Sequence, residues 1–215
     1  MKKAVMFDLD GTLINSLPDI AAAMNRALAA HSLPTHSLDA YRYMVGDGVI
    51  NLAKRAVKDR QDKMEDVLHA YRQDYALNCS VKTRPYDGIP AVLRQLKEMG
   101  MKIFVFSNKD QSDAETVCAH YFPSFSFDVI RGRVENVPVK PAPDGAFAIL
   151  NSQQILPEDC WYVGDTDTDM HCGTAAQMDT IGVLWGFREK EELIRCGAKH
   201  LAQTPSDLIK IMQAK

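Results

Sequence analysis

The sequence predicts an α/β fold in which a doubly wound parallel sheet forms the core and an α-helical segment is inserted into it. Two observations predict the core: short apolar runs recur along the chain, and segments with helical periodicity separate them. A third observation predicts the insertion, because residues 15–84 carry helical periodicity and no clear strand pattern. We therefore expect a core domain formed by residues 1–14 and 85–215, and a helical domain formed by residues 15–84.

Four apolar runs are the candidate strands of the core. They are KAVMF at 3–7, KIFVF at 102–106, CWYV at 160–163 and TIGVL at 180–184. Runs of this length are typical of parallel strands that are covered on both faces. Helices are expected between them, most clearly at 89–99, where apolar residues share one face and Gly100 follows. A last helix is expected after Thr204 and Pro205, an N-cap residue and a first-turn proline.

Composition narrows the class of protein. The 215 residues are 46% hydrophobic and 25% charged, and the net charge is only −3, so we expect neither a nucleic-acid partner nor a membrane partner. No apolar run approaches the roughly 20 residues of a membrane-spanning helix, and the N-terminus does not resemble a secretion signal. We therefore expect a cytoplasmic protein. The five cysteines are widely spaced without a CxxC pair, which predicts free thiols.

The strongest chemical signal is DLDGT at residues 8–12, directly after the first apolar run. Asp8 and Asp10 are two carboxylates at the end of a predicted strand, and Gly11 allows the chain to turn sharply. A calcium-binding EF-hand loop would need its glycine in the sixth position, whereas Gly11 is fourth. Ligands of open parallel sheets bind at the carboxyl ends of the strands, so this segment is a candidate active site.

Three further motifs are expected at the same edge of the sheet. Ser107 and Asn108 follow the second apolar run, where a hydroxyl and backbone amides can bind a phosphoryl oxygen. Lys140 precedes a proline-marked helix start, which suits an anion. The segment GDTDTD at 164–169 places Asp165 and Asp169 after the third run, as oxygen ligands for a hard cation. Together the motifs supply a nucleophile, an acid/base group, a metal site and phosphate donors.

In this order the motifs resemble those of the haloacid dehalogenase-like superfamily, namely DxDGT, Ser/Thr, Lys and GDxxxD. The resemblance spans the whole chain and implies a Rossmann-like core with a helical cap, which here corresponds to the insertion at 15–84. It implies that Asp8 is the nucleophile that accepts a phosphoryl group and that Asp10 is the general acid and base. Ser107 and Lys140 would stabilise the transferring group, and we expect Thr12 and Asn108 to help to bind phosphate.

The resemblance also implies a magnesium ion as cofactor. Its expected ligands are the Asp8 carboxylate, the Asp10 backbone carbonyl and Asp165, with Asp169 at the edge of the site. Such an ion would screen the nucleophile from the incoming phosphate dianion. The expected activity is magnesium-dependent hydrolysis of a small phosphorylated metabolite.

The insertion contains a possible specificity segment. MVGDGVINLAKRA at 44–56 is similar to the cap of phosphoglycolate phosphatases, which makes 2-phosphoglycolate the expected substrate. We expect Gly46 and Gly48 to form a tight loop facing the core and to offer backbone amides to the substrate, with a helix starting just after them. Asp47 would repel an anion if it pointed inward. The alternative is that both glycines only turn the chain between two cap helices.

Several other functions remain for comparison. A phosphomutase of the β-phosphoglucomutase type shares both aspartates and a similar cap, so the core motifs leave this alternative open. A non-catalytic phospho-acceptor module of the receiver type also has a phosphorylatable aspartate, but it lacks DxDGT and the helical insertion. A dehalogenase would lack Asp10, and a phosphonate hydrolase needs a cap lysine that the segment before Lys54 does not provide. The sequence does not indicate an oligomeric state.

Overall fold

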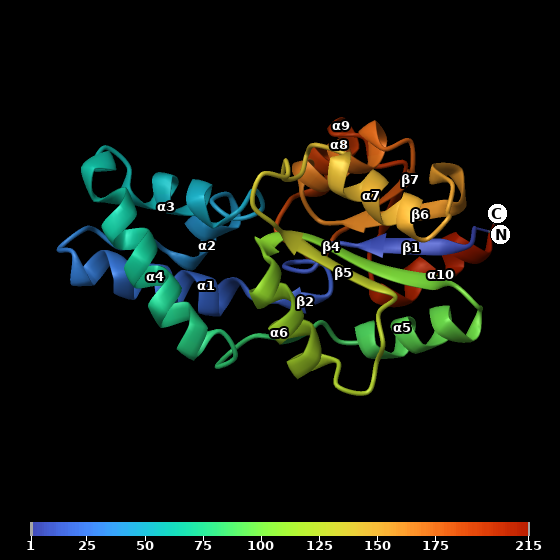
Figure 1. Cartoon of the computed structure of the whole chain (residues 1–215), viewed down its shortest axis with the longest axis horizontal. Coiled ribbons are helices and arrows are strands. Elements are labelled where there is room, and N and C mark those ends of the chain that lie inside the picture. The colour runs from blue at the N-terminus through green and yellow to red at the C-terminus, as the bar shows by residue number, and fades with distance from the viewer. Residues whose placement is uncertain (1, 215) are drawn as a thin grey trace.

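The core of the computed structural model, which describes residues 2–214, is a six-stranded parallel sheet (Figure 1). In spatial order its strands are β5 (Val129–Arg133), β4 (Lys102–Asp110), β1 (Ala4–Phe7), β6 (Cys160–Gly164), β7 (Asp179–Val183) and β8 (His200–Ala202). The four apolar runs of the sequence form β1, β4, β6 and β7, as predicted. Strands β5 and β8 were not predicted. Strand β4 extends past its apolar run to Asp110, so Ser107 and Asn108 lie within the strand, near its carboxyl end.

Helices cover both faces of this sheet, which confirms the doubly wound α/β prediction. Helices α5 (Ile89–Glu98), α6 (Gln111–Tyr121) and α10 (Pro205–Gln213) pack on one face, and α7 (Asp144–Ser152) and α8 (Asp167–Ala175) on the other (Figure 1). Successive side chains of β1 point to opposite faces of the sheet. Val5 and Phe7 pack against α5, α6 and α10, and Ala4 and Met6 pack against α7 and α8. Helix α9 (Lys190–Arg195) lies between β7 and β8 in the chain.

The insertion is a helical unit with its own apolar core. Its helices are α1 (Leu17–Ala30), α2 (Leu38–Arg42), α3 (Val49–Val57) and α4 (Met64–Asn78). Met24, Leu52 and Tyr71 are among the buried side chains that hold these helices together. Figure 1 shows the unit at one end of the sheet, on the side opposite the chain termini. We refer to it as the cap.

Two short strands at the base of the cap differ from the expectation of a purely helical segment. Strand β2 (Ile14–Asn15) pairs antiparallel with β3 (Arg84–Pro85), with Ile14 opposite Pro85. The pairing arises because the outgoing and returning chains pass side by side at this place. It supports our proposal that the cap domain begins at 15 and ends at 84, whereas residues 1 and 215, the outer ends of the proposed core domain, lie outside the described structure.

Smaller predictions of the sequence also hold. Helix α10 begins at Pro205 behind a capping box formed by Thr204 and Asp207. All five cysteines have free thiols. Among residues 2–214, no helix combines the length and the apolar character needed to cross a membrane.

The guanidinium of Arg188, on the core, forms hydrogen bonds with the cap. Arg188 follows β7, is only 7% exposed, and donates hydrogen bonds to the backbone carbonyls of Arg42 and Val45 in the cap. It also pairs with Glu192 on the core, with Nε 3.3 Å from Oε1. If the cap moved away, these hydrogen bonds from a charged donor would be exchanged for bonds to water. Their net contribution, about 1.5–3 kcal/mol, favours the docked cap.

We predict that Arg188→Met destabilises the protein by about 1–3 kcal/mol, because two cap carbonyls lose their donor. For a chain of this size, the melting temperature should fall by roughly 3–10 °C in a thermal unfolding experiment. Arg60→Gln is the control, since Arg60 makes only an exposed ion pair with Asp62 and its loss should leave the melting temperature unchanged. Equal melting temperatures for Arg188→Met and wild type would contradict this explanation of cap docking.

Candidate active site

The turn after β1 brings Asp8 to the carboxyl edge of the sheet. The amide of Asp8 donates to the Val163 carbonyl on neighbouring β6 (2.9 Å), which fixes the start of the turn. Gly11 has φ +95°, and a Cβ at this position would lie 2.2 Å from Oδ2 of Asp165. Only glycine therefore allows the DLDGT turn to pack against the GDTDTD segment. Two motifs that are far apart in the sequence meet here.

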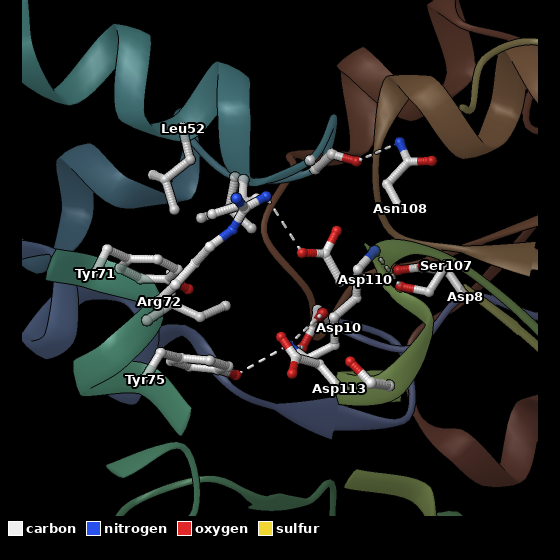
Figure 2. A pocket seen from close by; sticks show the side chains of 17 residues that line it. Asp8, Asp10, Leu52, Tyr71, Arg72, Tyr75, Ser107, Asn108, Asp110 and Asp113 are labelled. Atoms are coloured by element: carbon white, nitrogen blue, oxygen red, sulfur yellow. Dashed lines mark hydrogen bonds and ion pairs between the residues drawn. The ribbon is translucent and has the colours of Figure 1, made fainter. Parts of the chain in front are cut away.

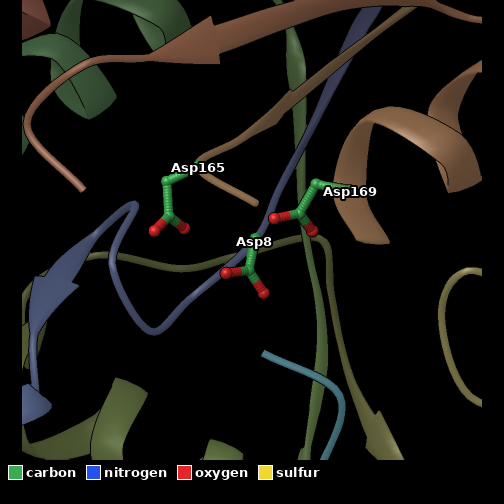
Figure 3. A group of neighbouring side chains, drawn as sticks. All are labelled: Asp8, Asp165 and Asp169. Carbon is green, nitrogen blue, oxygen red and sulfur yellow. The ribbon is translucent and has the colours of Figure 1, made fainter. Parts of the chain in front are cut away.

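Three buried carboxylates converge at this point: those of Asp8, Asp165 and Asp169 (Figure 3). One oxygen from each lies within 4.8 Å of the others. Asp165 follows β6, where Thr12 Oγ1 and the Phe187 amide donate to its two oxygens at 3.0 and 2.8 Å. Asp169 lies in the first turn of α8. Its Oδ2 is held there by the amide of Thr166 (3.1 Å), as part of a capping box.

A single buried lysine joins two of these carboxylates. Lys140 is 1% exposed, and its Nζ lies 2.6 Å from Asp8 Oδ1 and 2.8 Å from Asp169 Oδ1. The remaining proton of the ammonium is donated to the Phe106 carbonyl on β4 (3.0 Å). The sequence predicted Lys140 at a helix start, but α7 begins only at Asp144. The side chain of Asn108 fixes the Lys140 backbone instead, by one bond to each of its polar groups (2.8 and 3.0 Å).

The pKa shifts in the cluster show that its buried negative charge is only partly compensated by Lys140. Burial raises the pKa of Asp8 to about 7, although the Lys140 ammonium opposes this shift. Burial and the neighbouring Asp8 carboxylate raise the pKa of Asp165 well above its ordinary value. Burial alone would lower the pKa of Lys140, but Asp169 and Asp8 outweigh it and keep the ammonium charged. The cluster holds three carboxylates, and Lys140 pairs with only two of them. Carboxylate oxygens are the hard donors that a divalent cation prefers, so the residues present fit a metal ion.

A cavity of about 250 Å³ lies over this cluster, between cap and core (Figure 2). Asp8, Asp10 and Ser107 line it from the core, and Gly46 and Gly48 line it from the cap. The Ser107 hydroxyl accepts a hydrogen bond from the Lys109 amide (3.2 Å) and remains able to donate to a ligand. The cavity therefore brings the Asp8 carboxylate and the Ser107 hydroxyl together under a helical cover, and Asp8 connects it to the candidate metal cluster.

Two predicted phosphate-binding residues contact protein groups. Thr12 is fully buried and donates its hydroxyl to Asp165. Asn108 donates to the carbonyls of Lys140 and Gly46, both at 3.0 Å, and so connects the core site to the cap loop. Both residues hold other members of the site in place, and direct contact with phosphate stays a prediction for them.

Asp10 has a partner that the sequence analysis missed. Its carboxylate lies outside the cluster of Asp8, Asp165 and Asp169, and Lys109 Nζ lies 3.1 and 3.2 Å from its two oxygens. The hydroxyl of Tyr75 on α4 accepts a further bond from Lys109 (2.9 Å). One signal for Lys109 was present in the sequence, because it follows Ser107 by two residues and so shares its side of a strand. Nothing in the sequence indicated Tyr75.

Known proteins match this chain over nearly its full length. A phosphoglycolate phosphatase of Aquifex aeolicus is 34% identical over 210 residues, covering 98% of this chain and 96% of that protein. An N-acetylmuramic acid 6-phosphate phosphatase of Pseudomonas aeruginosa is 28% identical, covering 98% and 94%. The crystal structure of a protein from Lactobacillus delbrueckii subsp. bulgaricus superposes with a TM-score of 0.92 at 28% identity, covering 99% of both chains.

The family model for haloacid dehalogenase-like hydrolases matches residues 5–183. This range includes the DLDGT turn, the end of β4, Lys140 and the GDTDTD segment, which are the elements that meet in the site. The chain therefore belongs to the haloacid dehalogenase-like hydrolase family.

Proposed function

We propose that the protein is a magnesium-dependent phosphatase that hydrolyses a small phosphomonoester, 2-phosphoglycolate, through a phosphoaspartyl intermediate on Asp8. The observation that carries the proposal is the position of Asp8, which lies in the cavity wall with the Lys140 ammonium 2.6 Å from its Oδ1. A carboxylate with this environment is held in one orientation and partly neutralised, so a phosphate dianion can approach it.

In the first step, a carboxylate oxygen of Asp8 forms a bond to phosphorus while the ester P–O bond breaks. The leaving oxygen takes a proton from Asp10, which lines the same cavity. In the second step, water attacks the phosphorus of the phosphoaspartate, Asp10 accepts its proton, and the Asp8 carboxylate is released with inorganic phosphate. In both steps the Lys140 ammonium offsets negative charge beside Asp8, and the Ser107 hydroxyl can donate a hydrogen bond to the transferring group.

A magnesium ion in this site would be held by Asp8, Asp165 and Asp169, together with the backbone carbonyl of Asp10. When bound, it supplies positive charge that shields Asp8 and polarises the phosphoryl group. Asp165 and Asp169 act on the reaction only by holding the ion, and the contacts from Thr12, Phe187 and Thr166 keep their carboxylates aimed for this purpose.

Four observations support 2-phosphoglycolate as the substrate. The cavity is small and covered by the cap, which favours a small ester over a large one. The amides of Gly46, Asp47 and Gly48 donate no hydrogen bond within the described structure, and α3 begins directly after them, so this loop can receive a carboxylate. The carboxylate of Asp47 is engaged by Arg55 Nη2 (2.6 Å), which removes the repulsion that an unpaired Asp47 would cause. The Aquifex aeolicus relative bears the name of this activity.

We predict that Asp8→Asn lowers phosphate release roughly a thousandfold or more, because an amide of the same shape is a poor nucleophile. Phosphate release from 2-phosphoglycolate is the assay, and circular dichroism checks that the variant is folded. Asp39→Asn is the control, since Asp39 is exposed on the cap and its carboxylate makes only a 3.8 Å ion pair with Arg42. Near-normal turnover by folded Asp8→Asn would rule out the covalent mechanism.

We also predict that Mg²⁺ raises the melting temperature, and that it does so more at pH 8 than at pH 6. The folded pKa of Asp8 without metal is about 7, above its ordinary value of 3.8. Ionised Asp8 therefore costs stability, a cost that is absent below pH 3.8, grows as the pH rises and is complete above about pH 7. Magnesium relieves this cost only where the proton has left. A shift that is equal at both pH values, or activity that survives complete chelation, would contradict the metal assignment.

For the cap loop, we predict that Gly48→Ala lowers turnover of 2-phosphoglycolate about tenfold while p-nitrophenyl phosphate turnover stays within about twofold. Gly48 has φ +92°, so a side chain strains the loop and moves its amides. Gly100→Ala is a matched control, because Gly100 also has positive φ (+76°) but a Cβ added there would meet no atom within 4 Å. Equal losses on both substrates would show that the loop only turns the chain.

A further inference from the structure

We propose that Tyr75 of the cap is a positioning residue for Asp10, and that it acts through Lys109. Docking of α4 would then complete the contacts that hold the proton-transfer group in place. The inference rests on the proposed function, in which Asp10 handles the protons of both steps. It adds two residues to the site that no sequence motif contains.

The contacts of Lys109 form a bridge between three separate elements. Lys109 lies on β4, Asp10 on the turn after β1, and Tyr75 on cap helix α4. The ammonium spans both oxygens of Asp10 (3.1 and 3.2 Å) and donates to the Tyr75 hydroxyl (2.9 Å). It also lies 4.8 Å from the centre of the Tyr75 ring. Figure 2 shows the side chain of Tyr75 directed toward Asp10.

The hydrogen-bonding capacity of Lys109 is fully used by these contacts. An ammonium has three protons, and two carboxylate oxygens and one phenol oxygen account for them. The side chain is only 7% exposed, so water does not compete for them. Burial opposes the charge, but the neighbouring Asp10 and Tyr75 outweigh it and raise the pKa of Lys109 well above its ordinary value. Lys109 is therefore a fixed cation that orients Asp10, without a free proton for substrate.

The bridge exists only while α4 lies against the core. Tyr75 is the partner of Lys109 that the cap supplies. Arg72, one turn earlier on the same helix, makes a weaker contact with Asp110 on β4 (3.5 Å). If the cap moves away, Lys109 loses its third partner and its aromatic wall, and becomes exposed to water. The grip on both oxygens of Asp10 then loosens, because an exposed ion pair is worth little. Proton transfer is in this way tied to a closed cap.

The test compares two neighbouring tyrosines. Tyr75→Phe removes the hydroxyl that binds Lys109, and Tyr71→Phe removes a hydroxyl that makes no hydrogen bond within the described structure. The two rings stack on each other, with centroids 5.3 Å apart and planes 13° apart, and both line the cavity, so each variant removes only a hydroxyl from the same aromatic pair. We expect kcat for 2-phosphoglycolate to fall about tenfold in Tyr75→Phe with KM changed less than about twofold. Tyr71→Phe should keep the kcat of wild type, and an equal loss in both variants would overturn the inference.

A double-mutant cycle then shows whether Tyr75 acts through Lys109. Lys109→Met should lower kcat about a hundredfold, and adding Tyr75→Phe to it should cause no further loss. Lys109→Gln takes its place in the cycle if the methionine variant does not fold. Losses that simply multiply would mean that Tyr75 acts independently, and would contradict the proposal. If wild type releases no phosphate from any ester, the proposed function fails; additive losses in an active enzyme overturn only this inference.

Discussion

The ammonium of Lys140 is the interaction on which the rest of the site depends. It lies between the carboxylates of Asp8 and Asp169 in a region that is almost closed to water. Buried carboxylates are costly unless a cation compensates them, and removing one partner of such a pair typically costs about 3–5 kcal/mol. The two hydrogen bonds between the Asn108 side chain and the Lys140 backbone, and the bond from the Lys140 ammonium to the Phe106 carbonyl, hold this charge between the two carboxylates.

The order of the strands explains how four distant segments supply one site. Strands β4, β1 and β6 are adjacent and parallel, so their carboxyl ends place Ser107, Asp8 and Asp165 at the same edge of the sheet. The chain leaves and re-enters the core at this edge through β2 and β3, and this brings the cap over the cavity. Arg188, Asn108 and Lys109 each bond a cap residue from the core side, so closure of the cavity and order within the site are physically linked.

Much of this arrangement could be predicted from sequence because it follows from local patterns. Buried parallel strands read as apolar runs, and the residues just after them, such as Asp8 and Asp165, must then meet at one edge. Strand β5 escaped prediction because VIRGR carries two arginines, and β8 because it has only three residues. The bridge from Lys109 to Tyr75 could not be predicted, since it depends on how the cap packs over the core, which no periodicity encodes. Likewise, only the folded structure shows that Asp47 pairs with Arg55.

The central claim is that a phosphoryl group passes through Asp8, and direct trapping tests it. The protein would be mixed with a phosphate ester that it hydrolyses, radiolabelled at phosphorus, and quenched in acid during turnover. The label that stays on the protein measures the amount of phosphoenzyme. In a parallel sample, borohydride reduces the acyl phosphate to an alcohol and releases the phosphate, and peptide mass spectrometry then locates the carboxyl group that was converted. We predict an acyl phosphate on Asp8, in an amount of up to one per protein chain. Turnover with no label on the protein, or with the label on another residue, would contradict the claim.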